Sequence, residues 1–449
     1  MDITIRPAKL HGTVPPVPSK SDLHRALICA ALSDAPTEIL LPSPAPFSDD
    51  IRATAACLKA LGAGIEADFG NSEVQKAGRI RVTPVRAVPE RVVLNCGESG
   101  STARFMIPVA AALCKEAHFT GSGRLPDRPL SPLTDELKKH GCVCSSGHLP
   151  LTVTRTDDIG YSVSEEIPEY TLPGSISSQF ITGLLLAAPL TGGVRIRLST
   201  PLSSASYVDM TIDTMGRFGA AVRRTADGFE VPPPAAYRSP GTYMTDGGWS
   251  SAAFFIAADV LSSDPASYGR LTADASSGTG NAVSVTDLRR DSLQGDRVIA
   301  EIADHFRKRR MSGNPPEMTV DADSIPDLVP VIAVMAALTP GRTRIVNASR
   351  LRLKESDRLR TTAEMLSSLG AEIEELDSGL LISGKESLAG GTVSGCGDHR
   401  IVMSAAIASI GCRSDVTILG AEAVAKSYPS FWETFAAVGG RIKGENYVN

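Results

Sequence analysis

The sequence has few aromatic residues, no surplus of positive charge and no long apolar run. Aromatic residues make up 5% of the 449 residues and the formal net charge is −5, so we do not expect a general nucleic-acid binder. The longest apolar stretches, such as LVPVIAVMAAL (328–338), are too short to span a bilayer. The first residues lack the pattern of a secretory or transit peptide, which predicts a cytoplasmic protein.

Several motifs that would carry chemistry are also missing. The chain contains no G-x-x-x-x-G-K-[ST] phosphate loop, no H-E-x-x-H zinc motif and no G-x-S-x-G nucleophile elbow. Of the eight cysteines, Cys142 and Cys144 form a C-x-C pair, but no second pair follows at zinc spacing. We therefore expect reduced thiols, no metal and no cofactor.

Apolar helices that begin at small polar residues are abundant. Six segments share this form: 18–32, 96–113, 174–190, 247–261, 325–338 and 395–411. Because they are apolar nearly all round, they must be buried on most faces. Each helix start also offers unpaired N–H groups and the positive end of a dipole, which together favour anions.

A second kind of segment alternates with the first, an amphipathic helix that ends in glycine and leads into a strand. It occurs at 56–67, 135–145, 213–224, 363–376 and 434–444, with a degenerate copy near 302–313. The glycines fit the position after a helix end: Gly62, Gly141, Gly219, Gly370 and Gly439. Six such α/β units predict two domains of three units each, 1–15 plus 242–449 and 16–241.

The charged residues near the buried helix starts are mostly cations. They are Lys20, Arg25, Arg104, Arg124, Arg128, Lys354, Arg358, Arg400 and Lys426. Asp327 and Glu355 lie among them and suit proton transfer, although a helix cap and an ion pair are the alternative roles. The residues alone indicate a metal-free, two-domain enzyme that acts on small, multiply charged anions.

Eleven segments, in order along nearly the whole chain, resemble the 5-enolpyruvylshikimate-3-phosphate synthase (EPSP synthase) family. They are PSKSDLHRAL (18–27), SDDIRATAACLKALGA (48–63), CGESGSTARFM (96–106), GRLPDRPL (123–130), GSISSQF (174–180), SYVDMTI (206–212), LQGD (293–296), IPDL (325–328), LRLKESDRL (351–359), GDHRIVMS (397–404) and AKSYPSFW (425–432). The resemblance implies an α/β fold of two inverse α/β-barrel-like domains, each with three repeated units and buried parallel helices. It also implies enolpyruvyl transfer from phosphoenolpyruvate to the 5-hydroxyl of shikimate 3-phosphate, in the pathway to chorismate and the aromatic amino acids.

The resemblance also implies which residues bind each substrate. For shikimate 3-phosphate, bound by the 16–241 domain, they are Lys20, Ser21, Arg25, Ser177, Ser178, Gln179, Ser204 and Tyr207, with Asp327 and Lys354. For phosphoenolpyruvate, whose cations lie mainly in the other domain, they are Lys20, Gly100, Arg124, Gln179, Arg358, Arg400 and Lys426. Asp327 would be the base near the 5-hydroxyl, Glu355 the acid that protonates the enol carbon, and Lys20 would lie between the substrates.

Four positions depart from the family pattern: Glu98, Ser101, Gly248 and Arg350. Gly100 lacks a Cβ, which predicts an enzyme sensitive to glyphosate, an inhibitor that competes with phosphoenolpyruvate in sensitive members of this family. The nearest alternative is the enzyme that transfers enolpyruvate to UDP-N-acetylglucosamine, whose mobile loop carries a cysteine that GSGRLPDRP (121–129) lacks. A ring of repeats around DNA is less consistent with apolar helices in an acidic chain. We expect a monomer that binds neither nucleic acid nor membrane.

Overall fold

The computed structural model describes residues 1–67, 78–156, 167–264, 282–312 and 315–444, and the chain divides into two compact units. Unit 1 consists of Met1–Val17 and Gly247–Asn449, and unit 2 of Pro18–Asp246. The boundaries between the two units, after Val17 and after Asp246, lie a few residues later in the chain than the predicted boundaries after residues 15 and 241. The reason is that β14 (Thr242–Met244) pairs with β3 (Thr37–Leu40), which ties 242–246 to unit 2.

Three apolar helices form the interior of unit 2: α1 (Lys20–Ala31), α3 (Gly100–Leu113) and α5 (Ser178–Ala187). Their apolar residues are almost all buried, as the sequence predicts. A serine hydroxyl caps each helix start and so satisfies one backbone N–H group there. Helices α3 and α5 approach closely at Gly183, where a Cβ would lie 2.2 Å from the Arg104 carbonyl oxygen.

Three amphipathic helices alternate with the buried ones in unit 2: α2 (Asp49–Ala60), α4 (Ser131–Lys139) and α6 (Ala205–Arg217). Shortly after their ends come Gly62, Gly141 and Gly219, whose φ angles are +101°, +79° and +80°. A residue with a Cβ adopts this conformation only at a cost, which explains why the repeat keeps glycine here.

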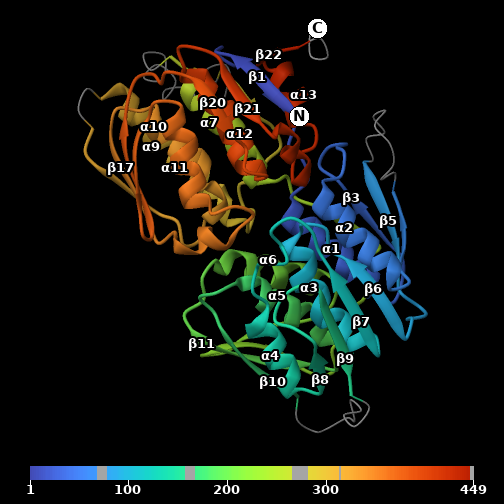
Figure 1. Cartoon of the computed structure of the whole chain (residues 1–449). Helices are drawn as coiled ribbons and strands as arrows, with labels where there is room; N and C mark the ends of the chain where they lie inside the picture. Colours follow the sequence, from blue (N-terminus) through green and yellow to red (C-terminus); the bar gives the residue numbers. More distant parts are fainter. Residues whose placement is uncertain (68–77, 157–166, 265–281, 313–314, 445–449) are drawn as a thin grey trace. The chain divides into compact units, whose positions relative to one another are not determined.

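Three four-stranded sheets in unit 2 share one topology. In each, the first two strands are parallel and the remaining neighbours are antiparallel. Figure 1 shows these strands at the outside of the unit, around the buried helices. The sheets are β14-β3-β5-β4, β6-β7-β9-β8 and β10-β11-β13-β12, in which β4 is Gly64–Glu66, β5 Arg79–Thr83, β6 Arg91–Asn95, β7 Glu116–Thr120, β8 Cys142–Cys144, β9 Leu151–Arg155, β10 Glu169–Pro173, β11 Val194–Thr200, β12 Arg223–Arg224 and β13 Gly228–Val231.

Unit 1 repeats this plan. Its buried helices are α7 (Trp249–Ser262), α10 (Val329–Ala337) and α12 (His399–Ala408), and its outer helices are α9 (Ile299–Met311), α11 (Arg358–Ser368) and α13 (Phe431–Ala437). Gly370 and Gly439 have φ angles of +88° and +95°, like their counterparts in unit 2. The six predicted buried helices and five predicted glycine positions are therefore confirmed.

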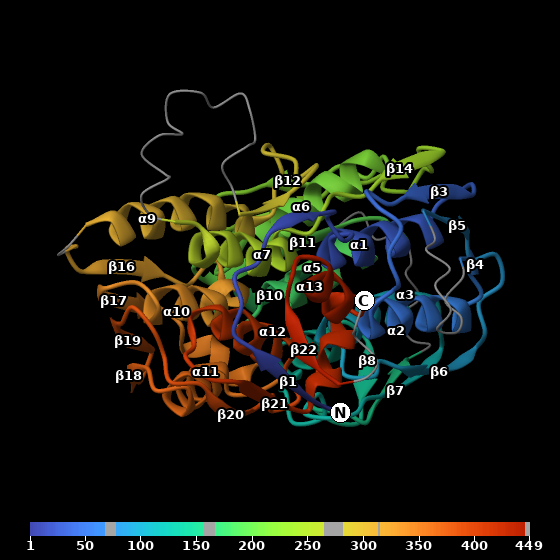
Figure 2. The same cartoon turned by 90° about the horizontal axis from the view of Figure 1, so that it is seen from above.

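Two sheets of unit 1 have the same topology as those of unit 2, and the third is reduced. The full sheets are β16-β17-β19-β18 and β20-β21-β1-β22, in which β16 is Met318–Asp321, β17 Gly341–Val346, β18 Glu372–Leu376, β19 Gly379–Gly384, β20 Gly391–Ser394, β21 Val416–Leu419, β1 Asp2–Arg6 and β22 Arg441–Lys443. Figure 2 shows β1, blue, among red strands from the opposite end of the chain.

The third sheet of unit 1 has two strands within the described residues, β15 (Val283–Val285) and β2 (Gly12–Val14), which run parallel. Helix α9 belongs to this repeat and ends in the C-cap Ser312. The helix of the degenerate copy predicted near 302–313 is thus found in the structure, and Gly313, which has the sequence position of the glycine in the other copies, lies outside the described residues. No helix in the described part of the chain is both long and apolar enough to cross a bilayer.

Candidate active site

Arg25 is the most deeply buried of the predicted substrate-binding cations of unit 2. It lies on α1, and its guanidinium donates to neutral oxygens: Ser21 O at 2.5 Å, Tyr207 O at 2.8 Å and Thr211 Oγ1 at 2.8 Å. Burial lowers the pKa of Arg25 to about 10, and its charged neighbour Asp22 only partly offsets this. A buried cation whose donors go to neutral groups favours the approach of an anion.

The starts of α3 and α5 are joined by the side-chain amide of Gln179. Its Oε1 accepts from Arg104 Nη1 at 3.1 Å, and its Nε2 donates to Ser101 Oγ at 2.9 Å. Because Gly100 adjoins Ser101, the structure brings Gln179 close to Gly100, and the family resemblance assigns both residues to phosphoenolpyruvate. Ser101, one of the departures from the family pattern, serves here as the acceptor that orients Gln179.

The structure distinguishes the two arginines of the GRLPDRPL loop. Arg124, the predicted ligand, is exposed, whereas Arg128 is buried. A Cβ at Gly100 would lie 2.8 Å from Arg128 Nη1, so Arg128 rather than Arg124 approaches the start of α3. The sequence analysis named both arginines but predicted that Arg124, the exposed one, binds phosphoenolpyruvate.

Ser204 and Tyr207 are brought to Arg25 by the first turn of α6. Ser204, buried, precedes this helix with φ +55°, a left-handed conformation that is uncommon for a residue with a Cβ. Such backbone geometry is often maintained where function requires it. Ser177 caps α5, and Ser178 is its first residue.

Lys20 is paired with an acidic residue that the sequence did not single out. Its Nζ lies 2.5 Å from Asp50 Oδ2, and both side chains are partly exposed. Asp50 belongs to the first turn of α2, 30 residues away in sequence. The residue predicted to lie between two anionic substrates is therefore held by a carboxylate in this structure.

Asp327 is the centre of the charged cluster in unit 1. It lies in η3 (Pro326–Leu328), and its carboxylate is 2.8 Å from Arg358 Nη1, 3.1 Å from Arg400 Nη2 and 3.6 Å from Lys354 Nζ. Burial would raise the pKa of Asp327, but Arg400, Lys354 and Arg358 outweigh it and hold that pKa well below its usual value. The structure thus brings together the predicted base and three predicted substrate-binding cations.

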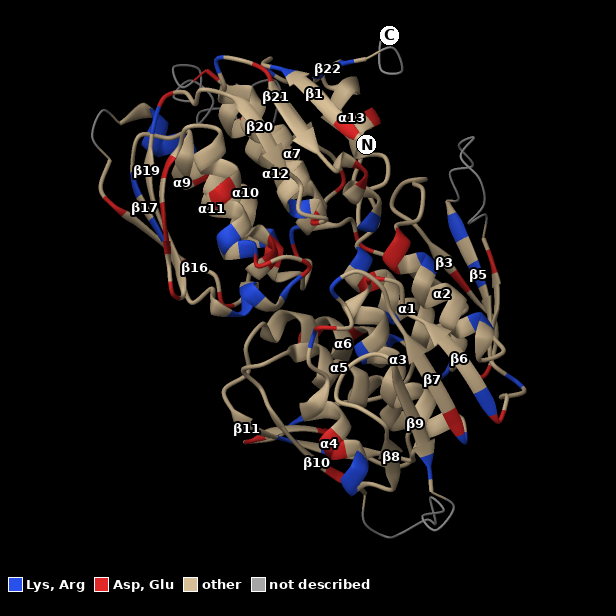
Figure 3. Ribbon diagram, viewed as in Figure 1, with Lys and Arg blue, Asp and Glu red and all other residues tan. Residues whose placement is uncertain are grey.

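Arg358 also contacts the predicted acid and a buried aspartate. Its Nη2 lies 2.5 Å from Glu355 Oε2, and its Nε donates to Asp398 Oδ2 at 2.7 Å. Burial would lower the pKa of Arg358, but Asp398, Glu355 and Asp327 raise it. Figure 3 shows the positive and negative segments together where α11 and α12 begin. Asp398, a residue that sequence reasoning missed, also caps α12.

Lys426 and Arg350 have contacts of their own within unit 1. Lys426 ends η6 (Ala421–Lys426), and its Nζ donates to Gly397 O at 2.6 Å, which places it next to the start of α12. Arg350 pairs with Asp323 at 3.2 Å. Gly248, another departure from the family pattern, precedes α7 and offers no side-chain cap.

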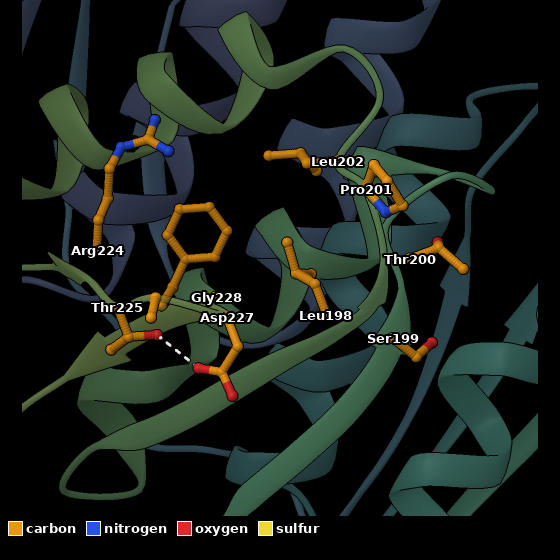
Figure 4. Close-up of a pocket in the computed structure, with 11 residues that line it drawn as sticks. Leu198, Ser199, Thr200, Pro201, Leu202, Arg224, Thr225, Asp227 and Gly228 are labelled. Atoms are coloured by element: carbon orange, nitrogen blue, oxygen red, sulfur yellow. Dashed lines mark hydrogen bonds between the residues drawn. The ribbon is translucent and has the colours of Figure 1, made fainter.

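A cavity of about 520 Å³ lies elsewhere in unit 2, against the ends of β11 and β13 (Figure 4). None of the predicted site residues lines it. Its charged lining residues are already paired, Arg224 with Asp209 and Asp227 with Arg197. The cavity therefore lacks the cationic character of the candidate site.

Comparison with known proteins places the whole chain in one family. The family model described as EPSP synthase (3-phosphoshikimate 1-carboxyvinyltransferase) matches residues 5–435. Proteins named 3-phosphoshikimate 1-carboxyvinyltransferase from Clostridium kluyveri and Clostridium novyi are 39% and 38% identical, with 98% of each chain covered. A solved EPSP synthase structure from Acinetobacter baumannii shares the fold, with a TM-score of 0.68 at 22% identity, covering 98% of this chain and 99% of that one. The chain belongs to the EPSP synthase family.

Proposed function

We propose that this protein transfers the enolpyruvyl group of phosphoenolpyruvate to the 5-hydroxyl of shikimate 3-phosphate, releasing phosphate. Family membership and the names of its relatives support this activity. The observation that carries the proposal is the convergence of Lys354, Arg358 and Arg400 on Asp327. Three cations around one carboxylate suit an anionic substrate that must exchange a proton.

We assign shikimate 3-phosphate to the cluster around Arg25 in unit 2. Arg25 supplies a charge already oriented by neutral acceptors, and Tyr207 and Ser204 lie on the turn that contacts it. Ser177, Ser178 and Gln179 add the hydroxyls and amide at the start of α5. Hydroxyl and guanidinium donors are the groups that a sugar phosphate requires.

For phosphoenolpyruvate we assign Arg358, Arg400 and Lys426 from unit 1, and Gly100, Gln179 and Arg128 from unit 2. Arg128 replaces the predicted Arg124 because it is buried and approaches Gly100. An anion that accepts from Arg358 and Arg400 takes donors away from Asp327. The pKa of Asp327, now held low by these cations, then rises and the carboxylate becomes a stronger base.

The chemistry then proceeds by addition and elimination. An anion that binds Arg358 also takes a donor away from Glu355, which then takes up a proton from solvent and can act as the acid. The 5-hydroxyl oxygen bonds to C2 of phosphoenolpyruvate, its proton passes to Asp327, and the electrons of the C2–C3 double bond take the proton of Glu355 at C3. The product of this step is a tetrahedral ketal phosphate. Glu355 then takes a proton back from C3 as the bond from C2 to the phosphate oxygen breaks, which restores the double bond and gives the enol ether. Asp327 passes its proton to the departing phosphate. The arginines and lysines stabilise the charge of the phosphate throughout.

A coupled assay of phosphate release tests the proposal. Phosphoenolpyruvate with shikimate 3-phosphate should release phosphate at a rate that exhaustive EDTA treatment leaves unchanged. Phosphoenolpyruvate with UDP-N-acetylglucosamine should release none. Activity with the nucleotide sugar alone would contradict the assignment of the acceptor and favour the alternative enolpyruvyl transferase.

A further inference from the structure

Asp296 is a buried carboxyl group next to the charged cluster of unit 1 that the mechanism above does not use. It lies in η2 (Gly295–Val298), in the segment LQGD, and is 4% exposed. Among the residues that the structure describes, its Oδ1 has no hydrogen-bond partner. A buried polar atom without a partner is costly, so its presence calls for an explanation.

Ser250 connects this carboxyl group to Arg400. The Ser250 hydroxyl, from the first turn of α7, lies beside the Asp296 carboxyl, whose pKa it lowers, and accepts from Arg400 Nη2 at 2.5 Å. Arg400 in turn donates to Asp327. Four groups from four elements therefore face Asp296: Ser250 from α7, Asp327 from η3, Lys354 next to η4 (Ser349–Leu353) and Arg400 from α12.

Of the carboxyl groups in this cluster, Asp296 has the least compensation of its negative charge by nearby cations. Asp327, Glu355 and Asp398 each lie in an ion pair with Arg358, whereas Asp296 lies beside the Ser250 hydroxyl. Burial and the nearby Asp327 raise the pKa of Asp296 to about 6. A bound anion would add negative charge next to these carboxylates, and like charges in a buried region cannot all stay ionised.

We propose that Asp296 is a positioning residue that takes up one proton from solvent when an anion binds to Arg400 and Arg358. The proton goes to Asp296 rather than to Asp327 because the pKa of Asp296 is already raised before the anion binds, whereas that of Asp327 starts well below its usual value. Asp327 thereby stays ionised and available to accept a proton from substrate. The identity of the natural anion, phosphoenolpyruvate, rests on the proposed function, whereas the proton uptake itself does not.

Calorimetry on the full-length protein tests this proposal. Binding of inorganic phosphate is measured at pH 7.5 and pH 5 in two buffers of different ionisation enthalpy, which gives the number of protons taken up. The wild type should take up as much as about one proton more than Asp296→Asn at pH 7.5, and no more at pH 5, where Asp296 is already protonated. The titration of phosphate itself cancels in this difference. Equal uptake by both proteins at pH 7.5 would overturn the proposal.

The same proton should appear in the pH dependence of catalysis. The ratio of the KM for phosphoenolpyruvate in the wild type to that in Asp296→Asn should grow by as much as about tenfold per pH unit above pH 6. A role limited to packing would change KM or stability without changing this pH dependence. A constant ratio between pH 6 and pH 8 would count against proton uptake by Asp296.

Two further variants keep the test decisive. Ser250→Ala removes the hydroxyl that favours the ionised form of Asp296, so the pH range in which anion binding takes up a proton should shift upward. An unchanged pH dependence of proton uptake would overturn the proposal, and this test holds even if Asp296→Asn fails to fold. Asp259→Asn is the matched control, because Asp259 is a buried aspartate of unit 1 that pairs with Arg307 at 2.6 Å outside the cluster. It should take up protons like the wild type, and a loss equal to that in Asp296→Asn would contradict the assignment.

These outcomes separate the inference from the proposed function. A wild-type protein that releases no phosphate from phosphoenolpyruvate and shikimate 3-phosphate contradicts the function, while phosphate binding still tests Asp296. A fully active wild type whose proton uptake matches that of Asp296→Asn contradicts only the inference.

Discussion

The cationic clusters of the two units differ in what holds them. In unit 1, Arg358 is surrounded by the carboxylates of Asp327, Glu355 and Asp398. In unit 2, Arg25 donates to a hydroxyl and two carbonyl oxygens. The carboxylates of unit 1 neutralise Arg358 before any ligand arrives, whereas the hydrogen bonds of Arg25 described above all go to neutral oxygens.

This difference implies two ways of binding an anion. An anion at Arg25 adds an acceptor to a guanidinium that is already oriented, so little rearrangement is required. An anion at Arg358 or Arg400 competes with carboxylates, and each carboxylate that loses its partner changes its affinity for protons. The proposed function therefore couples proton chemistry to ligand binding in unit 1, and it assigns to unit 2 mainly the holding of a ligand. Four predictions test this contrast.

The largest effect is expected from the two carboxylates of unit 1. Asp327→Asn and Glu355→Gln should each lower kcat by about two to four powers of ten, the usual contribution of a positioned acid or base. Shikimate 3-phosphate should bind nearly as before, because the residues around Arg25 are unchanged. Steady-state kinetics and equilibrium titration measure the two quantities.

The control for this pair is Glu364→Gln, an exposed carboxylate of α11 that pairs with Arg360. It should retain wild-type turnover. Wild-type kcat in both active-site variants would refute the idea that unit 1 carries the proton chemistry.

A second prediction compares the two arginines of the loop before α4. Arg128→Ala should raise the KM for phosphoenolpyruvate about 10- to 100-fold, since a charge-assisted hydrogen bond contributes about 1.5–3 kcal/mol. Arg124→Ala, at an exposed position in the same loop, should change it little. Kinetics of both variants decide the assignment, and the reverse ranking would restore the sequence-based choice.

A third prediction concerns the space next to Gly100. An added methyl group would lie 2.6 Å from Arg104 Nη1 and 2.8 Å from Arg128 Nη1, so Gly100→Ala must displace guanidinium groups. Glyphosate, which is longer than phosphoenolpyruvate, should bind about 10- to 100-fold more weakly, and the substrate should lose less.

Measured Ki and KM values test this steric argument. Gly216→Ala is the control, because a Cβ there meets no atom within 4 Å. Equal proportional losses for inhibitor and substrate would show that displacement of the arginines, rather than the length of the ligand, decides the outcome.

The smallest effect concerns stability in acid. Burial would raise the pKa of Asp398, but Arg358 lowers it, so its contribution is present above pH 4 and is lost as pH falls through the lowered pKa. Asp398→Asn should therefore lose less stability than the wild type between pH 6 and pH 3, by about 1 kcal/mol. Thermal unfolding at pH 3 and pH 6 measures this.

Asp22 in unit 2 provides the opposite case. Burial raises its pKa, so the folded protein holds this proton more tightly and gains stability as pH falls. Asp22→Asn should remove that gain. If both variants changed the pH dependence in the same direction, the contrast between the units would not extend to stability.

Much of the fold could be predicted from the sequence because the repeat carries its own signals. Apolar residues on every side of a helix indicate burial, and a glycine after an amphipathic helix indicates its end, as Gly62 and Gly370 illustrate. The boundaries between the two units were harder to predict from the sequence, because the pairing of β14 with β3 joins residues some 200 positions apart.

The cations of the site, which lie near helix starts, could be predicted from the sequence, but their partners could not. Arg358 meets Asp398 from 40 residues away, and Lys20 meets Asp50 from 30. The choice between Arg124 and Arg128 depended on which arginine the loop turns inward, and spacing alone does not decide that. Asp398 had one usable signal, its position immediately before the start of a buried helix.

Strand β1 also has a consequence for how the protein is made. It pairs with β21 and β22, so the first residues of unit 1 find their partners only when the last have been synthesised. Unit 2 is continuous from Pro18 to Asp246 and has a hydrophobic core of its own. On the ribosome, unit 2 is therefore expected to fold first, while the N-terminal strand waits for the rest of its sheet.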